Sequence, residues 1–184
     1  MGRFAVRQAV SSLVAIAGVV LVGCSSGSGA PEPTATAGPV SWQPCDEISP
    51  EALAAAGLRF DGDDGSRLAR ADPQSFGCIF SSDPPWTAPN VTVSGWSMTV
   101  DEAVKGEVLA ESELGGRRMI ATDDTNSRSC VVVIELPPGV ITLQVGWTPN
   151  PSESIKDAAS AVEACEYATG YAEGLAPAFP DRLG

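Results

Sequence analysis

The sequence contains no histidine, which excludes or weakens several common kinds of catalytic and metal site. A Ser-His-Asp triad needs an imidazole base, so the plentiful serines cannot act as triad nucleophiles. The cysteines include no CxxC pair, so their spacing indicates neither a zinc site nor a thioredoxin-like site. We therefore predict no metal, no cofactor and no catalytic residue.

Basic residues are also scarce, because 11 Lys and Arg stand against 23 Asp and Glu, a net charge of −12. Two of the basic residues, Arg3 and Arg7, lie within the first 23 positions, so residues 24–184 hold 9 basic and 23 acidic side chains, a net charge of −14. A surface of that sign repels a phosphate backbone, so we expect no nucleic acid partner. A solvated acidic surface explains the charge without a specific basic partner or cation.

Long apolar runs are missing as well, although a membrane-spanning helix needs about 20 apolar residues. The longest run, residues 9–22, is too short and follows Arg3 and Arg7, a pattern typical of a secretory signal. We therefore predict that the chain is exported and that no membrane span remains after processing.

Cys24 directly follows this apolar run, behind Leu-Val-Gly at positions 21–23. Small residues before a cysteine at that boundary are typical of a lipoprotein signal. We predict a signal peptide over residues 1–23 and a lipid on Cys24 that holds the protein on the outer face of the cell membrane. Cleavage by ordinary signal peptidase after Ala30 is the alternative.

Residues 24–39 are rich in Gly, Ser, Pro and Thr, so we expect a disordered tether there, and a single domain over residues 40–180. The pattern of that domain predicts an α+β fold, an antiparallel sheet of about five strands with helices packed on it. β-branched or alternating runs predict strands at residues 76–80, 90–98, 117–121, 130–136 and 140–148.

Capping signals place the expected helices. Ser49 precedes a helix over residues 50–56, Thr99 and Glu102 form a capping box for a helix to about Leu109, and Asn150 begins a long helix. The apolar residues of that last helix recur at helical spacing: Ile155, Ala158, Ala159, Val162, Cys165, Thr169, Ala172 and Leu175.

Four cysteines remain besides Cys24, and an even number in an exported domain indicates two disulfides, with three pairings open. Cys130 alternates with apolar residues on the strand face expected beneath the long helix, and Cys165 lies in that helix's apolar stripe. We therefore predict a Cys130–Cys165 bridge, which leaves Cys45 to pair with Cys78.

Several of these features together resemble a known family. They are Cys24 at the signal boundary, the tether, Pro-Cys-Asp at 44–46 before a helix, and Gly-Cys-Ile-Phe at 77–80 on a strand. The chain resembles the actinobacterial, mycobacterial-type lipoproteins that share a cysteine-containing domain of unknown function. The resemblance spans roughly residues 40–178 and implies location, disulfides and fold, but no mechanism.

The leading functional hypothesis is a lipid-anchored, non-enzymatic binding or interaction module for a small ligand or an envelope protein. Trp86, in the proline-rich loop at 83–89, is the candidate contact residue, unless it folds back as a lid on the core. Trp96 and Trp147 lie in expected strands and should serve packing.

Two alternatives stay open. One is an accessory subunit of a membrane or cell-wall complex, which should show an exposed apolar patch. The other is a carboxylate-based hydrolase of envelope glycans, which needs two carboxylates about 5–10 Å apart in one cleft. The acidic loop at residues 61–72 weakly resembles a calcium loop, but Gly65 and Ser66 stand at unsuitable positions, so we expect a solvated turn.

Overall fold

Eight strands form most of the structure, which is a computed structural model that describes residues 39–62, 66–69, 75–82, 90–124, 127–146 and 160–184. The described residues lie in one compact unit, Ala35–Gly184. The signal segment, Cys24, Trp86, Trp147 and Asn150 lie outside the described residues. The fold is therefore a mainly antiparallel sheet with a few helices, as the sequence predicts in outline.

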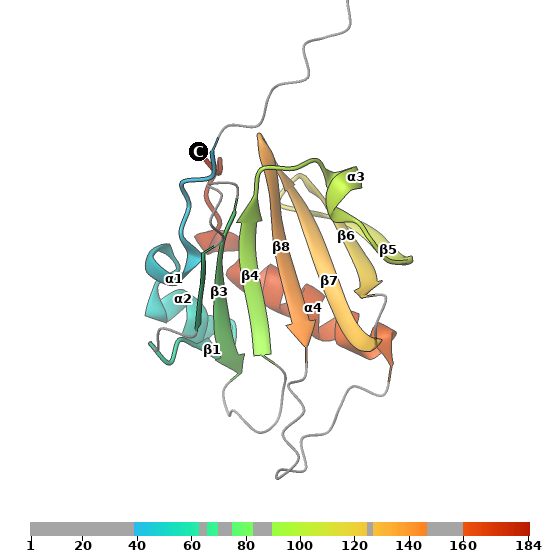
Figure 1. The fold of residues 1–184 in the computed structure, drawn as a ribbon. Coiled ribbons are helices and arrows are strands. Elements are labelled where there is room, and N and C mark those ends of the chain that lie inside the picture. The colour runs from blue at the N-terminus through green and yellow to red at the C-terminus, as the bar shows by residue number, and fades with distance from the viewer. Residues whose placement is uncertain (1–38, 63–65, 70–74, 83–89, 125–126, 147–159) are drawn as a thin grey trace, which may run out of the picture. The chain divides into compact units, whose positions relative to one another are not determined.

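The strands pair throughout in antiparallel fashion, in the order β1-β3-β4-β8-β7-β6-β5, with β2 also pairing with β3. Figure 1 shows this order across the sheet. The strands are β1 (Leu58–Arg59), β2 (Arg67–Ala69), β3 (Ser75–Ser82), β4 (Asn90–Trp96), β5 (Val108–Leu114), β6 (Arg117–Asp124), β7 (Ser127–Leu136) and β8 (Gly139–Gly146).

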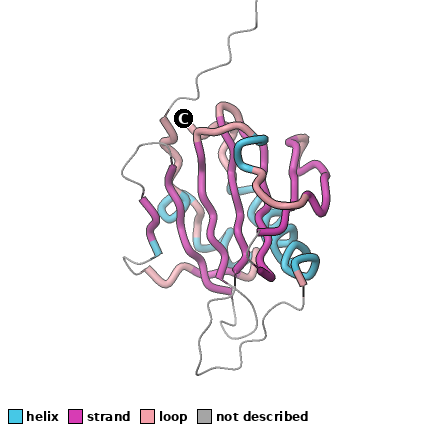
Figure 2. The backbone as a smooth tube through the Cα atoms, turned by 45° about the vertical axis from the view of Figure 1, so that its right-hand side comes forward, coloured by secondary structure: helices cyan, strands magenta, loops and turns pink. Residues whose placement is uncertain are grey.

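The helices are unequally shared between the two faces of the sheet. The long helix α4 (Ala161–Leu175) packs on β6, β7 and β8, while α1 (Pro44–Glu47) and α2 (Pro50–Ala55) cover the β1–β3 end of that same face (Figures 1 and 2). On the other face, α3 (Val100–Ala103) packs only on one end of β7 and β8. A 3-10 turn, η2 (Ala176–Ala178), follows α4.

The period-two alternation of the strands explains the main core, because every second residue points toward the helices. The largest fully buried side chains of this core come from the strands, from α4 and from the segment after η2. They are Phe80, Leu58, Ile134, Leu136, Ile141, Leu143, Leu175 and Leu183. A smaller cluster lies under α3 on the other face, formed by Val100, Ile120, Val133 and Val140.

Both cysteine pairs that the sequence suggested are joined in the structure. Cys130 of β7 is bonded to Cys165 of α4, with 5.0 Å between their Cα atoms, so this bridge ties the long helix to the sheet. Cys45 of α1 is bonded to Cys78 of β3, with 5.2 Å between their Cα atoms. Each disulfide therefore attaches a helix to the covered face.

All five expected strands are present, but the expected number was too low by three. β1 and β2 contain two and three residues, too few to show a period-two pattern. The third, β5, begins at Val108, within the last residues of the helix that the sequence predicted to run to about Leu109.

The capping box of Thr99 and Glu102 is present, yet α3 ends at Ala103. Gly106 explains the early end, because a Cβ there would lie only 1.8 Å from the carbonyl oxygen of Asp123. That close approach lets Glu107 and Asp123 exchange hydrogen bonds, the Glu107 N–H donating to Asp123 Oδ1 at 2.6 Å. The chain then continues as β5 and returns as β6 through Gly115 and Gly116, at φ 60° and 77°.

The long helix buries Cys165, Ala172 and Leu175 of the predicted apolar stripe, while Ile155, Ala158 and Ala159 of that stripe lie outside the described residues. Val162, assigned to the buried stripe, is 58% exposed, whereas the buried positions are Ala164, Cys165, Ala168, Ala172 and Leu175. The alanines allow a close approach to the sheet, and the bridge at Cys165 fixes which side of the helix faces it. The predicted stripe is therefore confirmed at Cys165, Ala172 and Leu175 and wrong at Val162.

The last residues of the chain pack on the domain, beyond the expected limit at residue 180. Leu183 is 1% exposed, and its carbonyl oxygen accepts the N–H groups of Ser41 and Trp42 at 2.8 and 3.3 Å. The Trp42 ring meets Phe179 edge-on, with 6.2 Å between the ring centroids. The start and the end of the described domain are thus adjacent.

Candidate binding site on the open face of the sheet

In the described part of the chain, the face opposite α4 carries no helix over most of β3, β4 and β8. On β4, Thr92, Ser94 and Trp96 point to this face, and the register places Thr142 of β8 opposite Ser94 and Gln144 opposite Thr92. Apolar residues between them point into the main core. Strand alternation therefore produces a patch of hydroxyl, amide and indole groups, which we call the open face.

Two hollows lie on the open face and meet at Trp96, Thr142 and Gln144. The first, the β2 hollow, has a volume of about 350 Å³ and extends to Arg67, Leu68, Ser75 and Gly77. The second, the α3 hollow, has a volume of about 640 Å³ and extends to Met98, Glu102, Ala103 and Lys105. Both volumes lie in the range of small-molecule sites.

The shared side chains are fixed by hydrogen bonds. The indole Nε1–H of Trp96 donates to Thr142 Oγ1 at 2.8 Å, which holds a half-buried ring between the two hollows. Gln144 Nε2 donates to Asp124 Oδ2 at 3.0 Å, and the same oxygen accepts from Ser129 Oγ at 3.3 Å. A ligand would meet polar groups that are already ordered, which lowers the entropic cost of binding.

Gly77 of β3 shapes the floor of the β2 hollow. It pairs with Ser94, and a Cβ at Gly77 would lie 2.4 Å from Ser94 Oγ and 3.3 Å from Leu68 Cβ. The missing side chain therefore leaves room for Ser94 and Leu68 on this face.

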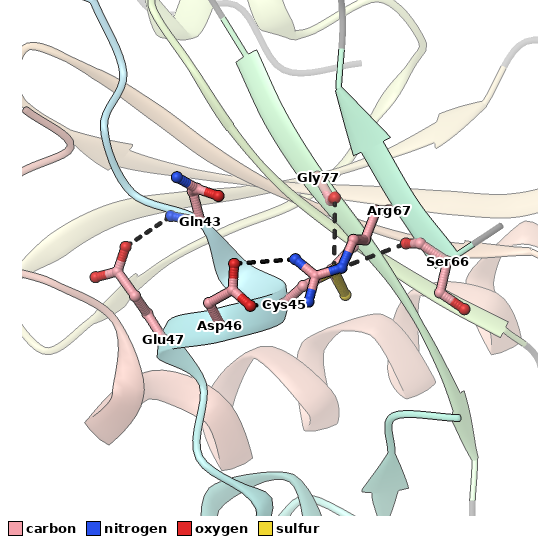
Figure 3. A network of polar contacts seen from close by, with 8 residues as sticks. Gln43, Cys45, Asp46, Glu47, Ser66, Arg67 and Gly77 are labelled. Atoms are coloured by element: carbon pink, nitrogen blue, oxygen red, sulfur yellow. Dashed lines mark hydrogen bonds and ion pairs between the residues drawn. A yellow bond between two sulfur atoms is a disulfide. The ribbon is translucent and has the colours of Figure 1, made fainter. Parts of the chain in front are cut away.

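Arg67 borders the β2 hollow but is held by an ion pair (Figure 3). Its two terminal nitrogens donate to the carboxylate oxygens of Asp46 at 2.9 and 2.8 Å, and its guanidinium lies 5.7 Å from the centre of the Phe60 ring. The hydrogen bonds from Arg67 lower the pKa of Asp46 below its usual 3.8. The register pairs Arg67 with Cys78, whose side chain faces the helices, so the guanidinium lies on that side of β2 together with Asp46.

The Cys45–Cys78 bridge lies beside this ion pair and supports it. Cys45 Sγ lies 3.8 Å from the carbonyl oxygen of Ser66 and 3.9 Å from that of Gly77 (Figure 3). A disulfide sulfur has no proton to donate, so these are packing contacts. They hold α1 against β2 and β3, and so position Arg67.

At the rim of the α3 hollow, Glu102 is occupied by its capping role. Its Oε2 accepts the N–H of Thr99 at 2.8 Å and the hydroxyl of Thr99 at 3.0 Å. The bond from the backbone N–H of Thr99 lowers the pKa of Glu102 most, and the bond from the Thr99 hydroxyl lowers it further. Lys105 lies at the same rim.

A separate hollow of about 320 Å³ brings Asp101 and Glu135 together with Arg118, near the turn between β7 and β8. Arg118 Nε donates to Glu111 Oε1 at 2.6 Å, and that bond lowers the pKa of Glu111. Two carboxylates also line a hollow of about 370 Å³ beside α4, where Glu163 and Glu166 lie with Tyr167 and Tyr171.

The sequence missed the open face. Trp96 packs against the cluster under α3, as the sequence predicted, and its half-buried side chain also lines both hollows. The signal was present in the alternating polar residues of Asn90–Trp96 and of Gly139–Gly146, which mark a strand face that no helix covers. Trp86, the expected contact residue, lies outside the described residues, as does Cys24.

No group of three or more His, Cys, Asp and Glu side chains within the described part of the chain is placed to hold a metal ion. No helix in the described ranges combines the length and the apolar character that crossing a membrane would require.

Comparison with known proteins gave one match. A family model described as a protein of unknown function (DUF3558) matches residues 19–178, which include Cys24, all four domain cysteines and every strand of the sheet. No curated protein and no solved structure matches the chain significantly.

Proposed function

Because the chain belongs to the DUF3558 family of proteins of unknown function, whose name supplies no activity, we propose a function from the geometry of the domain. The protein is a lipid-anchored, non-enzymatic binding module of the cell envelope, and it holds a small ligand on the open face of its sheet.

One observation carries this proposal. The sheet has helices across one face, whereas its other face presents two hollows that meet at an indole held by Thr142. A concave surface with a few fixed, convergent polar groups is the usual form of a small-molecule site. The disulfide at Cys45 and the pair of Asp46 with Arg67 give this surface a rigid border.

The location rests on the sequence. Cys24 directly follows a short apolar run that begins behind two arginines, and the family match includes this region. Two or three acyl chains on one cysteine give stable membrane attachment. We therefore place the domain at the outer face of the cell membrane, held through Cys24.

The absence of catalysis is also part of the proposal. The chain lacks histidine, and the three carboxyl groups with shifted pKa values among the described residues, Asp46, Glu102 and Glu111, are all shifted downward by hydrogen-bond donors. A carboxyl group that acts as a general acid needs the opposite shift. These groups are therefore suited to structural ion pairs and caps.

A second candidate function is that of an accessory subunit in a membrane or cell-wall complex. It is favoured by α4, on which Val162 is 58% and Tyr167 40% exposed. If this helix is a docking surface, Val162→Asp would release the protein from a complex on native gels and leave the open face unchanged.

Site-directed photo-crosslinking in intact cells tests the binding function. Benzoylphenylalanine at position 92 would lie on the open face, and the same residue at position 162 would lie on the exposed side of α4. We expect small-molecule adducts, seen by intact mass, from position 92 and not from position 162. Equal adducts at both positions, or none at position 92, would refute a ligand on the open face.

A further inference from the structure

We infer that the open face binds a neutral saccharide, an inference that rests on the proposed binding function. The hydrogen-bonding character of the lining, its aromatic ring and the state of its charges each point to this class of ligand.

The lining offers both donors and acceptors at close spacing, as a sugar does. Thr142 Oγ1 accepts the indole N–H of Trp96, so its own proton can be donated to a ligand oxygen. Gln144 donates through Nε2 to Asp124, which leaves its carboxamide oxygen as an acceptor. Ser94 and Thr92 add hydroxyl groups, each of which can donate or accept a hydrogen bond.

Trp96 supplies the apolar part of the site. Its half-buried ring lines both hollows, and the bond to Thr142 prevents the ring from turning away. One face of a pyranose carries only C–H groups, which pack on an aromatic surface, while its hydroxyls point sideways to polar partners. The Trp96 ring, flanked by Thr, Ser and Gln side chains on the sheet, offers an apolar surface for the C–H face and polar partners for the hydroxyl groups.

The charges of the lining argue for a neutral ligand. Arg67 is paired through two hydrogen bonds with Asp46, and Glu102 accepts hydrogen bonds from Thr99. An anionic ligand at Arg67 would have to displace Asp46 or share its donors. Lys105, at the far rim of the α3 hollow, is the residue through which an anionic ligand would instead be recognised.

The test uses the full chain with ¹⁵N-labelled tryptophan. The sequence has four tryptophans, so the indole N–H of Trp96 is assigned by its loss in Trp96→Phe. The probes are neutral oligosaccharides: α- and β-linked glucose, N-acetylglucosamine, mannose, galactose and arabinose oligomers. We expect a saturable shift of the Trp96 signal by at least one of them, with a Kd of about 1 mM or lower.

Two variants sharpen the result. Thr142→Val keeps the shape of the side chain but removes its hydroxyl, so it should weaken saccharide binding about tenfold or more, equivalent to about 1.4 kcal/mol. Val162→Ala, on the exposed side of α4, should leave the Kd unchanged. The Kd should also stay the same between low salt and about 0.5 M NaCl, because no ion pair forms.

Two results would overturn the saccharide inference. One is the absence of any saturable shift of the Trp96 signal across the whole panel. The other is binding only of an anionic probe such as sialyllactose, weakened by salt and by Lys105→Ala. If the crosslinker at position 92 still captured a small molecule, the binding function would stand and its ligand class would be different. If position 92 captured nothing, both would fail.

Discussion

Thr142 links stability and binding at the level of a single residue. Its hydroxyl oxygen accepts the Trp96 indole N–H at 2.8 Å, on a surface that would be open to a ligand. A hydrogen bond of this type contributes about 1 kcal/mol to folding.

We expect Thr142→Val to lower the free energy of unfolding by about 1 kcal/mol, since the half-buried indole would lose its acceptor. Urea unfolding followed by circular dichroism measures the change. Thr92→Val makes the same substitution on the same face but away from the indole, and should change stability by less than about 0.5 kcal/mol. Equal losses in both variants would contradict the role given to the Trp96–Thr142 bond.

Gly139 is the second residue on which the site depends, because a Cβ there would lie 1.9 Å from the carbonyl oxygen of Trp96. Gly139→Ala should force β8 and β4 apart and destabilise the domain by about 2–3 kcal/mol. Gly146→Ala is the matched control at the other end of β8, where no atom lies within 4 Å of the added carbon. The melting temperatures of the two variants should differ clearly, and a similar value for both would refute the close approach.

At the residue scale, the sequence predicted the cysteines better than the tryptophans. Cysteines in an exported domain have few alternatives to pairing, and strand alternation identified the partner of Cys130. Whether Trp96 is covered depends on what packs above its strand, which is a property of the whole sheet. No local pattern around Trp96 contains that information.

At the scale of elements, α1 and α4 are each attached to the sheet by a disulfide, and α1 is also attached by the ion pair of Asp46 with Arg67. The Cys130–Cys165 bridge joins α4 to β7, and the Cys45–Cys78 bridge joins α1 to β3. Their sequence separations, 35 and 33 residues, are nearly equal.

Replacing either cysteine pair by alanine should therefore cost about the same, roughly 3.8 kcal/mol, if chain entropy in the unfolded state dominates. Guanidinium unfolding of the Cys45→Ala/Cys78→Ala and Cys130→Ala/Cys165→Ala proteins gives the two values. A much larger loss for the second pair would show that the bridge at α4 also stabilises native packing, which the loop-entropy model omits.

The pair of Asp46 on α1 and Arg67 on β2 gives a prediction for pH. The folded-state pKa of Asp46 lies below its usual 3.8, so the stabilisation is present at neutral pH and is lost as pH falls through the lowered pKa. Asp46→Asn should be less stable than the parent at pH 6, and this difference in urea midpoint should disappear as the pH is lowered below 3.8. A difference that persisted in acid would mean that the amide disrupts α1 for another reason.

The sequence located most elements but not all of their limits, and it assigned one exposed residue of α4 to the buried side. The helix predicted to run from Thr99 to Leu109 was half wrong, because the missing side chain at Gly106 lets Asp123 draw the chain into β5. On α4, the exposure of Val162 arises from the bridge at Cys165 and from the small residues packed under the helix. Both outcomes depend on tertiary contacts, which outweigh local propensity.

For the molecule as a whole, the sequence indicated an α+β domain with two disulfides, and it predicted the antiparallel pairing. It did not indicate which face would stay open. That outcome follows from the placement of α1, α2 and α4 on a single side, because two helices near the start of the domain share one face with a helix near its end.

Attachment through Cys24 is the prediction at this scale. In the native host, the parent chain should fractionate with membranes and incorporate an azido-palmitate label, whereas Cys24→Ala should do neither. Intact mass of the mature protein distinguishes cleavage before Cys24 from cleavage after Ala30. An unmodified N-terminus at Pro31 would refute the anchor and leave the folded domain unaffected.

The hydrogen bonds from Ser41 and Trp42 to the carbonyl oxygen of Leu183 have a consequence for how the domain is held. The chain enters and leaves the domain at one corner, where a Cβ on Gly184 would lie 2.7 Å from the carbonyl oxygen of Pro39 (Figure 1). A mechanical force applied through the N-terminal segment would therefore act first on that corner. It would be transmitted to the strands of the open face only through the rest of the sheet. A reporter fused after Gly184 would share the corner with the tether and leave the saccharide surface unobstructed.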